Sequence, residues 1–397
     1  MLHDLAWAVE LLTTAMTLAG MGYLLATMVA AWGHLLGRRR QPPAFAPGVS
    51  ILKSLKGLDP GMMEAFRSHC RQNYAGEYEL LFGVSSADDP AAAAVEELKR
   101  EFPQLPIRLI VCPQRLGANG KVSTLVQMAG HAHYDYLLIN DSDITASPRY
   151  LERVMACFVP AAEPQKADQP PVGLVTTLYR GRAHGTPASL FEELGIATDF
   201  MPGVLLSKLV EGGLHYGLGA TLAVSREALE KAGGLMAVVD YLADDYELGA
   251  RVDRAGYRVA LSAEVVETAV PPYSLRGFFD HQLRWMRTVR AARPAGYVGL
   301  IFAHGLTWAM LNLLASGVSP LSLWLLVLCF FLRLAQAMLV GTEVLGDRRV
   351  LPTLWMLPLR DLLAMGLWIA GFAGDTIVWR GERFVLDGGR LRKAVGS

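Results

Sequence analysis

Residues 136–143 of this 397-residue chain read Tyr-Leu-Leu-Ile-Asn-Asp-Ser-Asp, and this stretch decides the fold. The residues 136–140 predict a short buried strand, which ends directly in the carboxylates of Asp141 and Asp143. Working outward, similar strands are predicted at 49–53, 78–84 and 107–111, and helices lie between them at 60–73, 91–101 and 122–132. This alternation predicts an α/β domain with a Rossmann-like, mostly parallel sheet, whose ligands lie at the carboxyl ends of the strands.

The second half of the domain is less regular. After a surface loop at 163–171, the sequence predicts strands at 172–178 and 217–224, and helices at 186–210, from Ser225 to Gly233, and at 246–255. A basic, aromatic and amphipathic stretch follows at 274–292. Such a stretch is typical of a helix that lies on a bilayer surface.

Long apolar runs stand at both ends of the chain. Residues 5–36 are almost wholly apolar and long enough to span a bilayer. Basic residues follow this run, at Arg38-Arg39-Arg40, instead of preceding it, which predicts an uncleaved anchor with its N-terminus outside. The residues from 40 onward are then expected in the cytosol.

Two further apolar runs, at 298–318 and 320–345, predict a transmembrane hairpin. The last run, 350–378, is interrupted by prolines and by Arg360 and Asp361. It predicts either an interfacial helix plus one span or a re-entrant pair, so the side of the C-terminal tail stays open.

Composition agrees with a membrane protein. Hydrophobic residues make up 52% and charged residues 19% of the chain, whereas a soluble domain carries about 25% charge. The net charge is zero, so composition gives no argument for nucleic acid as a partner. The four cysteines are scattered, with no spacing for zinc or a disulfide framework, which predicts reduced thiols.

These patterns divide the chain into five parts. They are a transmembrane anchor at 1–40, a catalytic domain at 41–273, an amphipathic interfacial segment at 274–297, a transmembrane region at 298–380 and a tail at 381–397.

The pair Asp141 and Asp143 is the candidate metal site. Two carboxylates at i and i+2 after a buried strand can both reach one cation, and Mg²⁺ or Mn²⁺ prefers oxygen ligands that it shares with substrate phosphates. The alternative is an Asx turn or helix cap before Pro148. A sugar nucleotide needs such a metal, since its leaving group is a diphosphate.

Two more motifs are candidates for the nucleotide. Asp89, in Asp88-Asp89-Pro90, follows a predicted strand and can accept hydrogen bonds from a base or ribose, although Asp-Pro is also a good helix start. Lys121 ends the turn 117–121 at a helix start, which suits an anion. A flexible loop with a solvated lysine is the alternative.

The pair Asp244-Asp245 precedes a predicted helix. A carboxylate placed here can deprotonate an acceptor hydroxyl as it attacks the anomeric carbon, and direct attack inverts the configuration. The alternative is favourable acidic charge at a helix N-terminus. Asp244 is a further candidate for substrate binding, and His215 is a candidate for the acceptor site, although a lone histidine is more often structural.

The motif His281-Gln282-Leu283-Arg284-Trp285 lies on the amphipathic stretch. Arg284 can bind a phosphate oxygen bidentately, and Trp285 can stack on a sugar. His281 and Gln282 are further candidates for substrate binding. A helix on the membrane surface is the alternative for each of these residues taken alone.

Together these motifs resemble the ceramide glucosyltransferase family, which is glycosyltransferase family 21 with a GT-A fold. The resemblance begins with the run 49–60 and covers roughly residues 45–295. It implies a UDP-sugar donor, Mg²⁺ or Mn²⁺, inversion and a lipid acceptor. It also implies the roles by position: Asp89 contacts the nucleotide, Asp141 and Asp143 bind the metal, Asp245 is the general base, and Arg284 with Trp285 forms the arginine-tryptophan motif.

One departure bears on the substrates. The pentapeptide begins at His281, where the family usually has Gln or Arg, and Gln282 follows one place later. Together with the run 66–72, the residues His281 and Gln282 resemble the bacterial branch linked to hopanoid synthesis more than they resemble the ceramide enzymes. That resemblance implies transfer of N-acetylglucosamine to bacteriohopanetetrol, in the place of glucose to ceramide.

We therefore expect an integral protein of a bacterial inner membrane, with its catalytic domain in the cytoplasm. The expected activity is an inverting, metal-dependent transfer from a UDP-sugar to a membrane lipid. UDP-N-acetylglucosamine with a hopanoid is favoured, and UDP-glucose with ceramide is the alternative. A processive polysaccharide synthase would need more spans after the catalytic domain. A non-catalytic scaffold would bind neither UDP nor metal.

Overall fold

The computed structural model describes residues 2–38, 44–159, 169–379 and 382–393. Arg39 and Arg40 of the basic cluster, most of the predicted loop 163–171 and the ends of the predicted tail lie outside the described residues. The chain forms two compact units. The helical unit comprises residues 1–39, 185–210 and 272–375, and the sheet unit comprises residues 40–184, 211–271 and 376–397.

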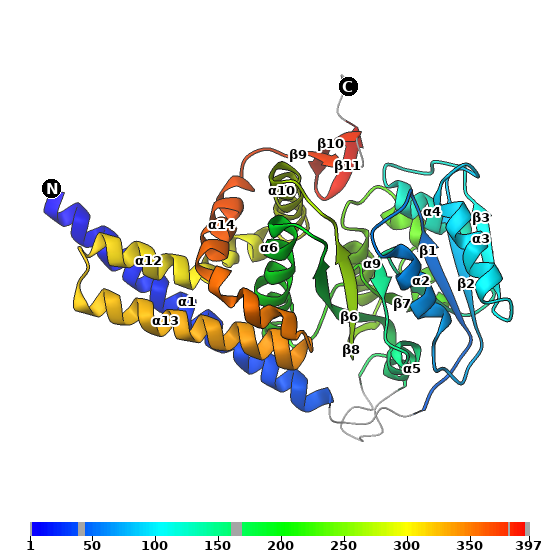
Figure 1. Ribbon diagram of the computed structural model, residues 1–397, viewed down its shortest axis with the longest axis horizontal. Helices are drawn as coiled ribbons and strands as arrows, with labels where there is room; N and C mark the ends of the chain where they lie inside the picture. Colours follow the sequence, from blue (N-terminus) through cyan, green and yellow to red (C-terminus); the bar gives the residue numbers. More distant parts are fainter. Residues whose placement is uncertain (1, 39–43, 160–168, 380–381, 394–397) are drawn as a thin grey trace. The chain divides into compact units, whose positions relative to one another are not determined.

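The sheet unit is built on an eight-stranded sheet with the order β3-β2-β1-β4-β7-β6-β8-β5 (Figure 1). The strands are β1 (Val49–Ser54), β2 (Tyr78–Val84), β3 (Ile107–Val111), β4 (Tyr136–Ile139), β5 (Ile144–Thr145), β6 (Val172–Ala183), β7 (Leu222–Ser225) and β8 (Arg258–Val270). The pairs β1–β2, β2–β3, β1–β4 and β6–β8 are parallel, whereas the pairs with β7 and β5 are antiparallel. The predicted α/β class with a mostly parallel sheet is confirmed.

Several strands of the large sheet differ from the prediction. The short strand β5 is not predicted, and β6 continues to Ala183, beyond its predicted end at 178. The strand expected at 217–224 begins only at Leu222, because the glycine-rich residues before it form a tight turn with a bridge between Leu218 and Thr221. The strand β8 is absent from the sequence prediction. Its buried and half-buried side chains alternate irregularly, and its pairing with β6 contains register shifts, so no clean period marks it in the sequence.

Helices flank the sheet. They are α2 (Met62–Cys70), α3 (Ala91–Glu101), α4 (Gly120–Ala129), α5 (Tyr150–Met155), α8 (Arg226–Lys231) and α9 (Asp244–Arg254), with two short 3-10 helices, η1 (Ala156–Phe158) and η4 (Leu235–Val238). Of these, α2, α3, α4, α8 and α9 confirm predicted helices, whereas α5, η1 and η4 are not predicted from the sequence. The helix α4 begins at Asn119, whose side chain accepts a hydrogen bond from the backbone amide of Val122. The first two strands contribute fully buried residues such as Ile51, Leu52 and Phe82 to the core.

Three short strands near the C-terminus form a second, antiparallel sheet in the sheet unit. They are β9 (Thr376–Trp379), β10 (Glu382–Asp387) and β11 (Arg390–Lys393). The sequence predicts only a tail at residues 381–397. The strands are short and rich in charge, and buried side chains such as Phe384 and Leu391 stand singly between exposed ones, so no apolar run marks them.

The helical unit contains a long first helix, α1 (Leu2–Arg38), and three groups of later helices. The first group is α6 (Pro187–Gly195), a π-helical segment η3 (Ile196–Phe200) and α7 (Met201–Val210). The second is α10 (Leu275–Ala292), α11 (Pro294–Gly299), η5 (Leu300–His304) and α12 (Gly305–Ala315). The third is α13 (Pro320–Met338), a π-helical segment η6 (Leu339–Val344), the 3-10 helix η7 (Arg348–Met356) and α14 (Leu357–Ala370).

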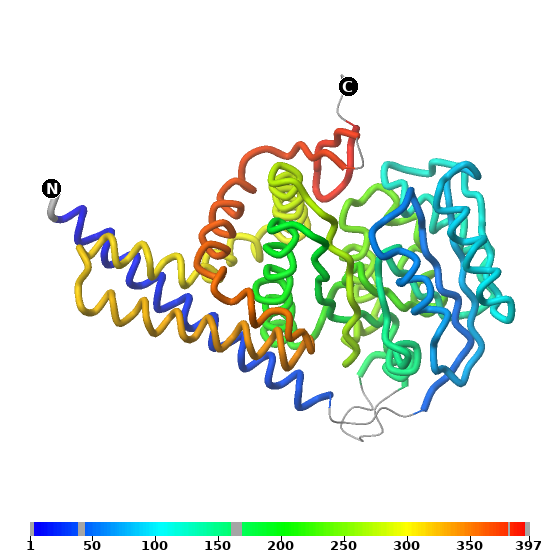
Figure 2. Tube along the Cα trace, in the orientation of Figure 1, coloured from blue at the N-terminus to red at the C-terminus, as the bar shows by residue number. Residues whose placement is uncertain are grey.

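Four helical segments of this unit are long and apolar enough to cross a membrane. They are Asp4–Arg38, Pro294–Ala315, Pro320–Val344 and Arg348–Ala370. The first three match the runs predicted from the sequence. The helix α1 packs along α12 and α13, and the tube in Figure 2 shows these three helices side by side.

Small residues let α1 and α12 approach closely. A Cβ added at Gly20 would lie 2.2 Å from the Cα atom of Gly305, a distance that no real Cβ contact allows. About two turns further along the same pair of helices, the hydroxyl of Thr14 donates to the side-chain oxygen of Asn312 at 2.9 Å. Such close, small-residue crossings with interhelical hydrogen bonds are typical of helices packed in a membrane.

We expect Gly20→Val to destabilise the helical unit, because the new side chain must push α12 away. The expected cost is about 1–3 kcal/mol, read as a lower midpoint of thermal unfolding in detergent. Gly22→Val is the matched control, since nothing lies within 4 Å of a Cβ added there. Equal midpoints for the two variants would contradict this packing.

Candidate active site

The carboxyl end of β4 carries the first part of the site. Asn140, directly after the strand, is buried and donates from Nδ2 to the carbonyl oxygen of Ala220 at 2.6 Å and to the hydroxyl of Tyr150 at 3.0 Å. From the neighbouring strand β1, the fully buried ammonium of Lys53 donates to the backbone carbonyl of Asp141 at 2.9 Å. These hydrogen bonds hold the turn that follows β4 in place, and the Asp141 side chain lies on the solvent-exposed side of this turn.

Asp141 and Asp143 differ in their surroundings. The side chain of Asp141 is 41% exposed, whereas Asp143 is half-buried and its Oδ2 atom accepts a hydrogen bond from the hydroxyl of Thr268 at 2.6 Å. Between them, the hydroxyl of Ser142 donates to Asp59 at 2.5 Å. Hydrogen bonds to Asp59 and Thr268 therefore hold this turn, and Asp141 is the carboxylate that is accessible to solvent.

Lys121 links this turn to the acidic pair on α9. Its ammonium lies 2.7 Å from Oδ1 of Asp141 and 3.5 Å from Oδ2 of Asp244. The other oxygen of Asp244 accepts from the side-chain amide of Asn119 at 3.3 Å. The lysine from the glycine-rich turn therefore lies between two of the three acidic clusters that the sequence singles out.

Asp245 borders the same space as Asp141. A Cβ added at Gly219 would lie 3.0 Å from Oδ2 of Asp245 and 3.6 Å from Oδ2 of Asp141. The turn that carries Gly219 packs tightly on α9, because a Cβ at Gly249 would lie only 2.1 Å from the backbone nitrogen of Gly217. Glycines therefore leave room for two carboxylates to face one small space.

The electrostatics of this group are strongly perturbed. Burial, reinforced by the charge of Asp244, raises the pKa of Asp245 to about 6, and burial with the charge of Asp141 raises the pKa of Asp143 to about 6. Burial lowers the pKa of Lys53 to about 7, against the opposite effect of the nearby carboxylates. Clusters of this kind, in which carboxylates hold raised pKa values, are typical of functional sites.

The C-terminal strands brace the loop that precedes α9. The amide of Leu391 donates to the carbonyl oxygen of Asp240 at 2.7 Å, and the amide of Leu242 donates to that of Gly389 at 3.2 Å. On its other side, Asp240 accepts at Oδ1 from the amide of Ala118 at 2.8 Å. The tail, the loop before Asp244 and the turn before Lys121 therefore form one continuous hydrogen-bonded assembly.

The donor set of Asp141 and Asp143 fits a hard divalent cation. Both offer carboxylate oxygens, the ligands that Mg²⁺ and Mn²⁺ prefer, and one or two carboxylates with substrate phosphates are enough for such a metal. Among the residues that the structure describes, no group of three or more His, Cys, Asp or Glu side chains is arranged to hold a metal by itself. The protein therefore offers part of a coordination shell, which phosphate oxygens would complete.

Two other predicted site residues have structural partners in the sheet unit. Asp89 accepts at Oδ1 from the amide of Gly57 at 3.0 Å and from that of Ala91 at 2.9 Å, so it ties the loop after β1 to the start of α3. His215 is exposed, and its Nδ1 atom lies 3.0 Å from Oδ1 of Asp253. The binding of substrate by Asp89 and by His215 stays a prediction, because these contacts are all within the protein.

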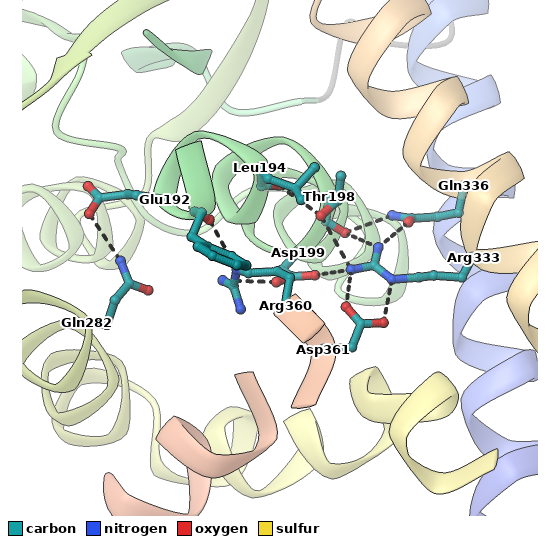
Figure 3. Close-up of polar contacts among 10 residues, drawn as sticks. Glu192, Leu194, Thr198, Asp199, Gln282, Arg333, Gln336, Arg360 and Asp361 are labelled. Carbon is teal, nitrogen blue, oxygen red and sulfur yellow. Dashed lines mark hydrogen bonds and ion pairs between the residues drawn. The ribbon is translucent and has the colours of Figure 1, made fainter. Parts of the chain in front are cut away.

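The pentapeptide motif lies on α10 in the helical unit. His281 and Gln282 both bind the buried carboxylate of Glu192 on α6, at 3.1 and 3.2 Å, and Figure 3 shows the glutamine contact. The ring of Trp285 lies 5.7 Å from that of Phe200, at the end of the π-helical segment. Arg284 is half-buried on the same helix. The motif therefore packs on the helical segment 187–200.

The same segment joins a buried network of charges, drawn in Figure 3. Arg333 on α13 is 3% exposed and donates to Asp361 from Nε at 2.9 Å and from Nη2 at 2.7 Å. It also donates to Asp199 at 2.5 Å and to the carbonyl oxygen of Thr198 at 2.7 Å. Arg360 lies 3.0 Å from the second oxygen of Asp199. Two positive and two negative side chains thus balance each other between the helices.

Sequence reasoning missed several residues of the candidate site, and only one had a visible signal. Lys53 is a charged residue inside a strand that is otherwise buried, and such a residue is rare without a partner. Asn119 bonds to Asp244, which is 125 residues away in the chain, and Gly219 faces Asp141 and Asp245, which come from two other elements. Nothing in their local sequence indicates those contacts.

Comparisons with known proteins agree with this architecture. The model of the family described as Glycosyl transferase family 21 matches residues 12–391. Ceramide glucosyltransferase 3 of Caenorhabditis elegans is 28% identical over 86% of this chain and 73% of its own length, and Ceramide glucosyltransferase 1 of the same organism is 24% identical over 92% and 77%.

A solved structure shares the fold. The mannosyltransferase PcManGT from Pyrobaculum calidifontis, in complex with GDP-Man and Mn²⁺, matches 92% of this chain and 99% of its own with a TM-score of 0.50 and 18% identity. At this identity the likeness shows the fold alone, and it confirms the GT-A fold that the sequence resemblance implies.

Proposed function

Because the chain belongs to glycosyltransferase family 21, we propose that it transfers a sugar from a UDP-sugar to a hydroxyl group of a membrane lipid, with inversion. The observation that carries the proposal is the meeting of Asp141, Asp245 and Lys121 around one small space at the carboxyl end of β4. The lipid acceptor is supported by the two ceramide glucosyltransferase relatives and by the apolar helices of the helical unit.

Each residue of the group has a separate proposed role. Asp245 takes the proton from the acceptor hydroxyl as its oxygen attacks the anomeric carbon. Lys121 and Arg284 bind phosphate oxygens, Asp89 contacts the nucleotide, and Trp285 stacks on the sugar. The further candidates His215, Asp244, His281 and Gln282 are proposed to line or support the substrate sites.

Asp141 and Asp143 would hold Mg²⁺ or Mn²⁺, which neutralises the charge that develops on the diphosphate leaving group. The open carboxylate of Asp141 supports this role, and so does the Mn²⁺ bound in the related fold of PcManGT. Treatment with a chelator is therefore expected to abolish transfer, and either cation should restore it. Full activity in the chelated enzyme would contradict a metal requirement.

For the substrates, we favour UDP-N-acetylglucosamine and a hopanoid such as bacteriohopanetetrol, on the resemblance carried by His281. The second candidate is UDP-glucose with ceramide, which the names of the two relatives favour. Purified enzyme assayed with both labelled donors against both lipids separates the two. Failure of all four pairs, in enzyme that still binds UDP, would contradict both assignments.

The proposed location is a bacterial inner membrane, with the sheet unit in the cytoplasm where UDP-sugars are made. Arg38 at the end of α1 donates to the carbonyl oxygen of Val344 at 2.6 Å, so the basic residue Arg38 lies beside the end of the third apolar segment, which Arg348 and Arg349 follow. Basic residues at one end favour the cytoplasmic side. A processive synthase is the less favoured alternative, since three apolar segments, at 294–315, 320–344 and 348–370, follow the proposed catalytic residues in the part of the chain that the structure describes.

The pH dependence follows from the raised pKa of Asp245. Below about 6 this carboxyl is mostly protonated and cannot accept the acceptor proton, so kcat/KM is expected to fall with decreasing pH by up to tenfold per unit. Above about 7 the profile should be flat with respect to this group. A profile that stays flat down to pH 5, in enzyme that remains folded by circular dichroism, would contradict the assignment of the base.

A further inference from the structure

The fourth apolar segment, 348–370, has an unusual distribution of side chains. Its exposed apolar residues, called the stripe below, are Leu351 and Trp355 on the 3-10 helix η7, and Leu359, Leu362 and Ile369, which follow the helical repeat on α14. Trp355 is 77% exposed and Ile369 is 57% exposed. The charged residues Arg360 and Asp361 are instead buried, on ion pairs with other helices. A water-facing helix exposes charged side chains and buries apolar ones, whereas this segment does the opposite. The stripe therefore requires an apolar partner.

The path of the chain decides how this segment meets a membrane. All four apolar segments belong to the helical unit, so the sheet unit lies on one side of a bilayer. The helix α1 ends at Arg38 and leads into the sheet unit, and Val344 at the end of the third segment accepts a hydrogen bond from Arg38. The third segment therefore ends on the side of the sheet unit.

The segment also finishes on that side. The strands from Thr376 onward belong to the sheet unit, where Leu391 bonds to Asp240. Within the helical unit, Arg287 and Arg290 of α10 donate to the carbonyl oxygens of Ala373 and Phe372 at 2.8 and 2.6 Å. The helix α10 comes directly from the sheet unit and precedes the second segment. Both ends of 348–370 thus lie on one side.

We propose that residues 348–370 do not cross the membrane but enter a single leaflet, with the stripe from Leu351 to Ile369 in contact with lipid chains. Two crossings would need about 40 apolar residues, and this segment has 23 residues in all. The buried pair of Arg333 and Asp361 holds it against α13 from within. The partner of this surface is the acyl region of the leaflet on the catalytic side, and three segments span the bilayer.

Epitope tags in sealed membrane vesicles test the number of crossings. One tag is placed before residue 1, one within the loop that the sequence predicts at 163–171 and one after Ser397. We expect the loop tag and the C-terminal tag to be protected together, and the N-terminal tag to behave in the opposite way. A C-terminal tag on the side opposite to the loop tag would overturn the proposal.

Depth measurements test the orientation of the stripe. Leu359→Cys and Ile369→Cys are labelled with an environment-sensitive dye and quenched by lipids that carry nitroxides at fixed depths. A helix in the plane of the leaflet gives similar depths at both positions. A spanning helix separates them by about 15 Å, and that result would overturn the proposal. Arg276→Cys on α10, whose side chain is 95% exposed, is the control for a water-facing position. Neither experiment depends on which sugar or lipid the enzyme uses.

Discussion

Asp245→Asn is expected to lower the rate of sugar transfer by roughly 10²–10⁴-fold, while the enzyme keeps its affinity for UDP. The carboxamide has the size of the carboxylate, so the tight packing of the glycine turn against α9 is retained. It cannot accept the proton of the acceptor hydroxyl, and that step is the proposed task of this side chain. The loss should therefore appear in kcat with little change in the KM for the donor.

Glu247→Gln is the matched control, because it removes one negative charge from the same helix two residues away. Glu247 is half-buried and pairs with Arg251 and Arg254 of α9, and no ion pair joins it to Lys121 among the described residues. Its transfer rate should stay close to that of the wild type. UDP binding by calorimetry confirms that both variants are folded. An Asp245→Asn enzyme within tenfold of the wild-type rate would remove Asp245 as the base.

Arg333→Leu is expected to destabilise the helical unit by about 3–5 kcal/mol. The substitution leaves Asp361 without its main partner in a buried position, and it removes one of the two cations that balance Asp199. A buried charge without a partner costs far more than an exposed one. The measurement is the midpoint of thermal unfolding in detergent, followed by the tryptophan fluorescence of the protein.

Two further variants separate charge from packing. Arg333→Leu combined with Asp361→Leu removes both members of the closest pair, so it should recover part of the loss. Arg276→Leu changes an arginine whose side chain is 95% exposed and should leave the midpoint nearly unchanged. If the double variant loses as much stability, relative to the wild type, as Arg333→Leu and Asp361→Leu lose together when measured singly, the pairing has no net role.

The strands that carry the site were predictable because each is a short apolar run that ends in polar residues. Tyr136–Ile139 and Val49–Ser54 fall where their sequences indicate, and the acidic clusters follow the strands as expected. The resemblance to family 21 and the α/β class are confirmed. The roles assigned to Asp89, Asp141, Asp143, Asp245, Arg284 and Trp285 remain predictions.

The contacts that shape the site were not predictable, because they join distant parts of the chain. Lys121 reaches Asp244 across more than a hundred residues, and Gly219 matters only because two carboxylates face it. The arrangement of the fourth apolar segment, 348–370, was likewise not predictable from the sequence. Its composition allows a membrane crossing, whereas the hydrogen bonds of Val344 and Ala373, next to its two ends, support our proposal that it starts and finishes on one side.

The bonds between β11 and the loop before α9 have a consequence for the order in which the protein is made. Asp240 and Leu242 receive their partners from residues 389–391, which are synthesised after all four apolar segments. A nascent chain can therefore insert its three proposed spanning helices and form most of its large sheet while the loop beside the proposed base still lacks these bonds. Emergence of residues 389–391, and not insertion into the membrane, is then the event that completes the hydrogen bonds of this loop.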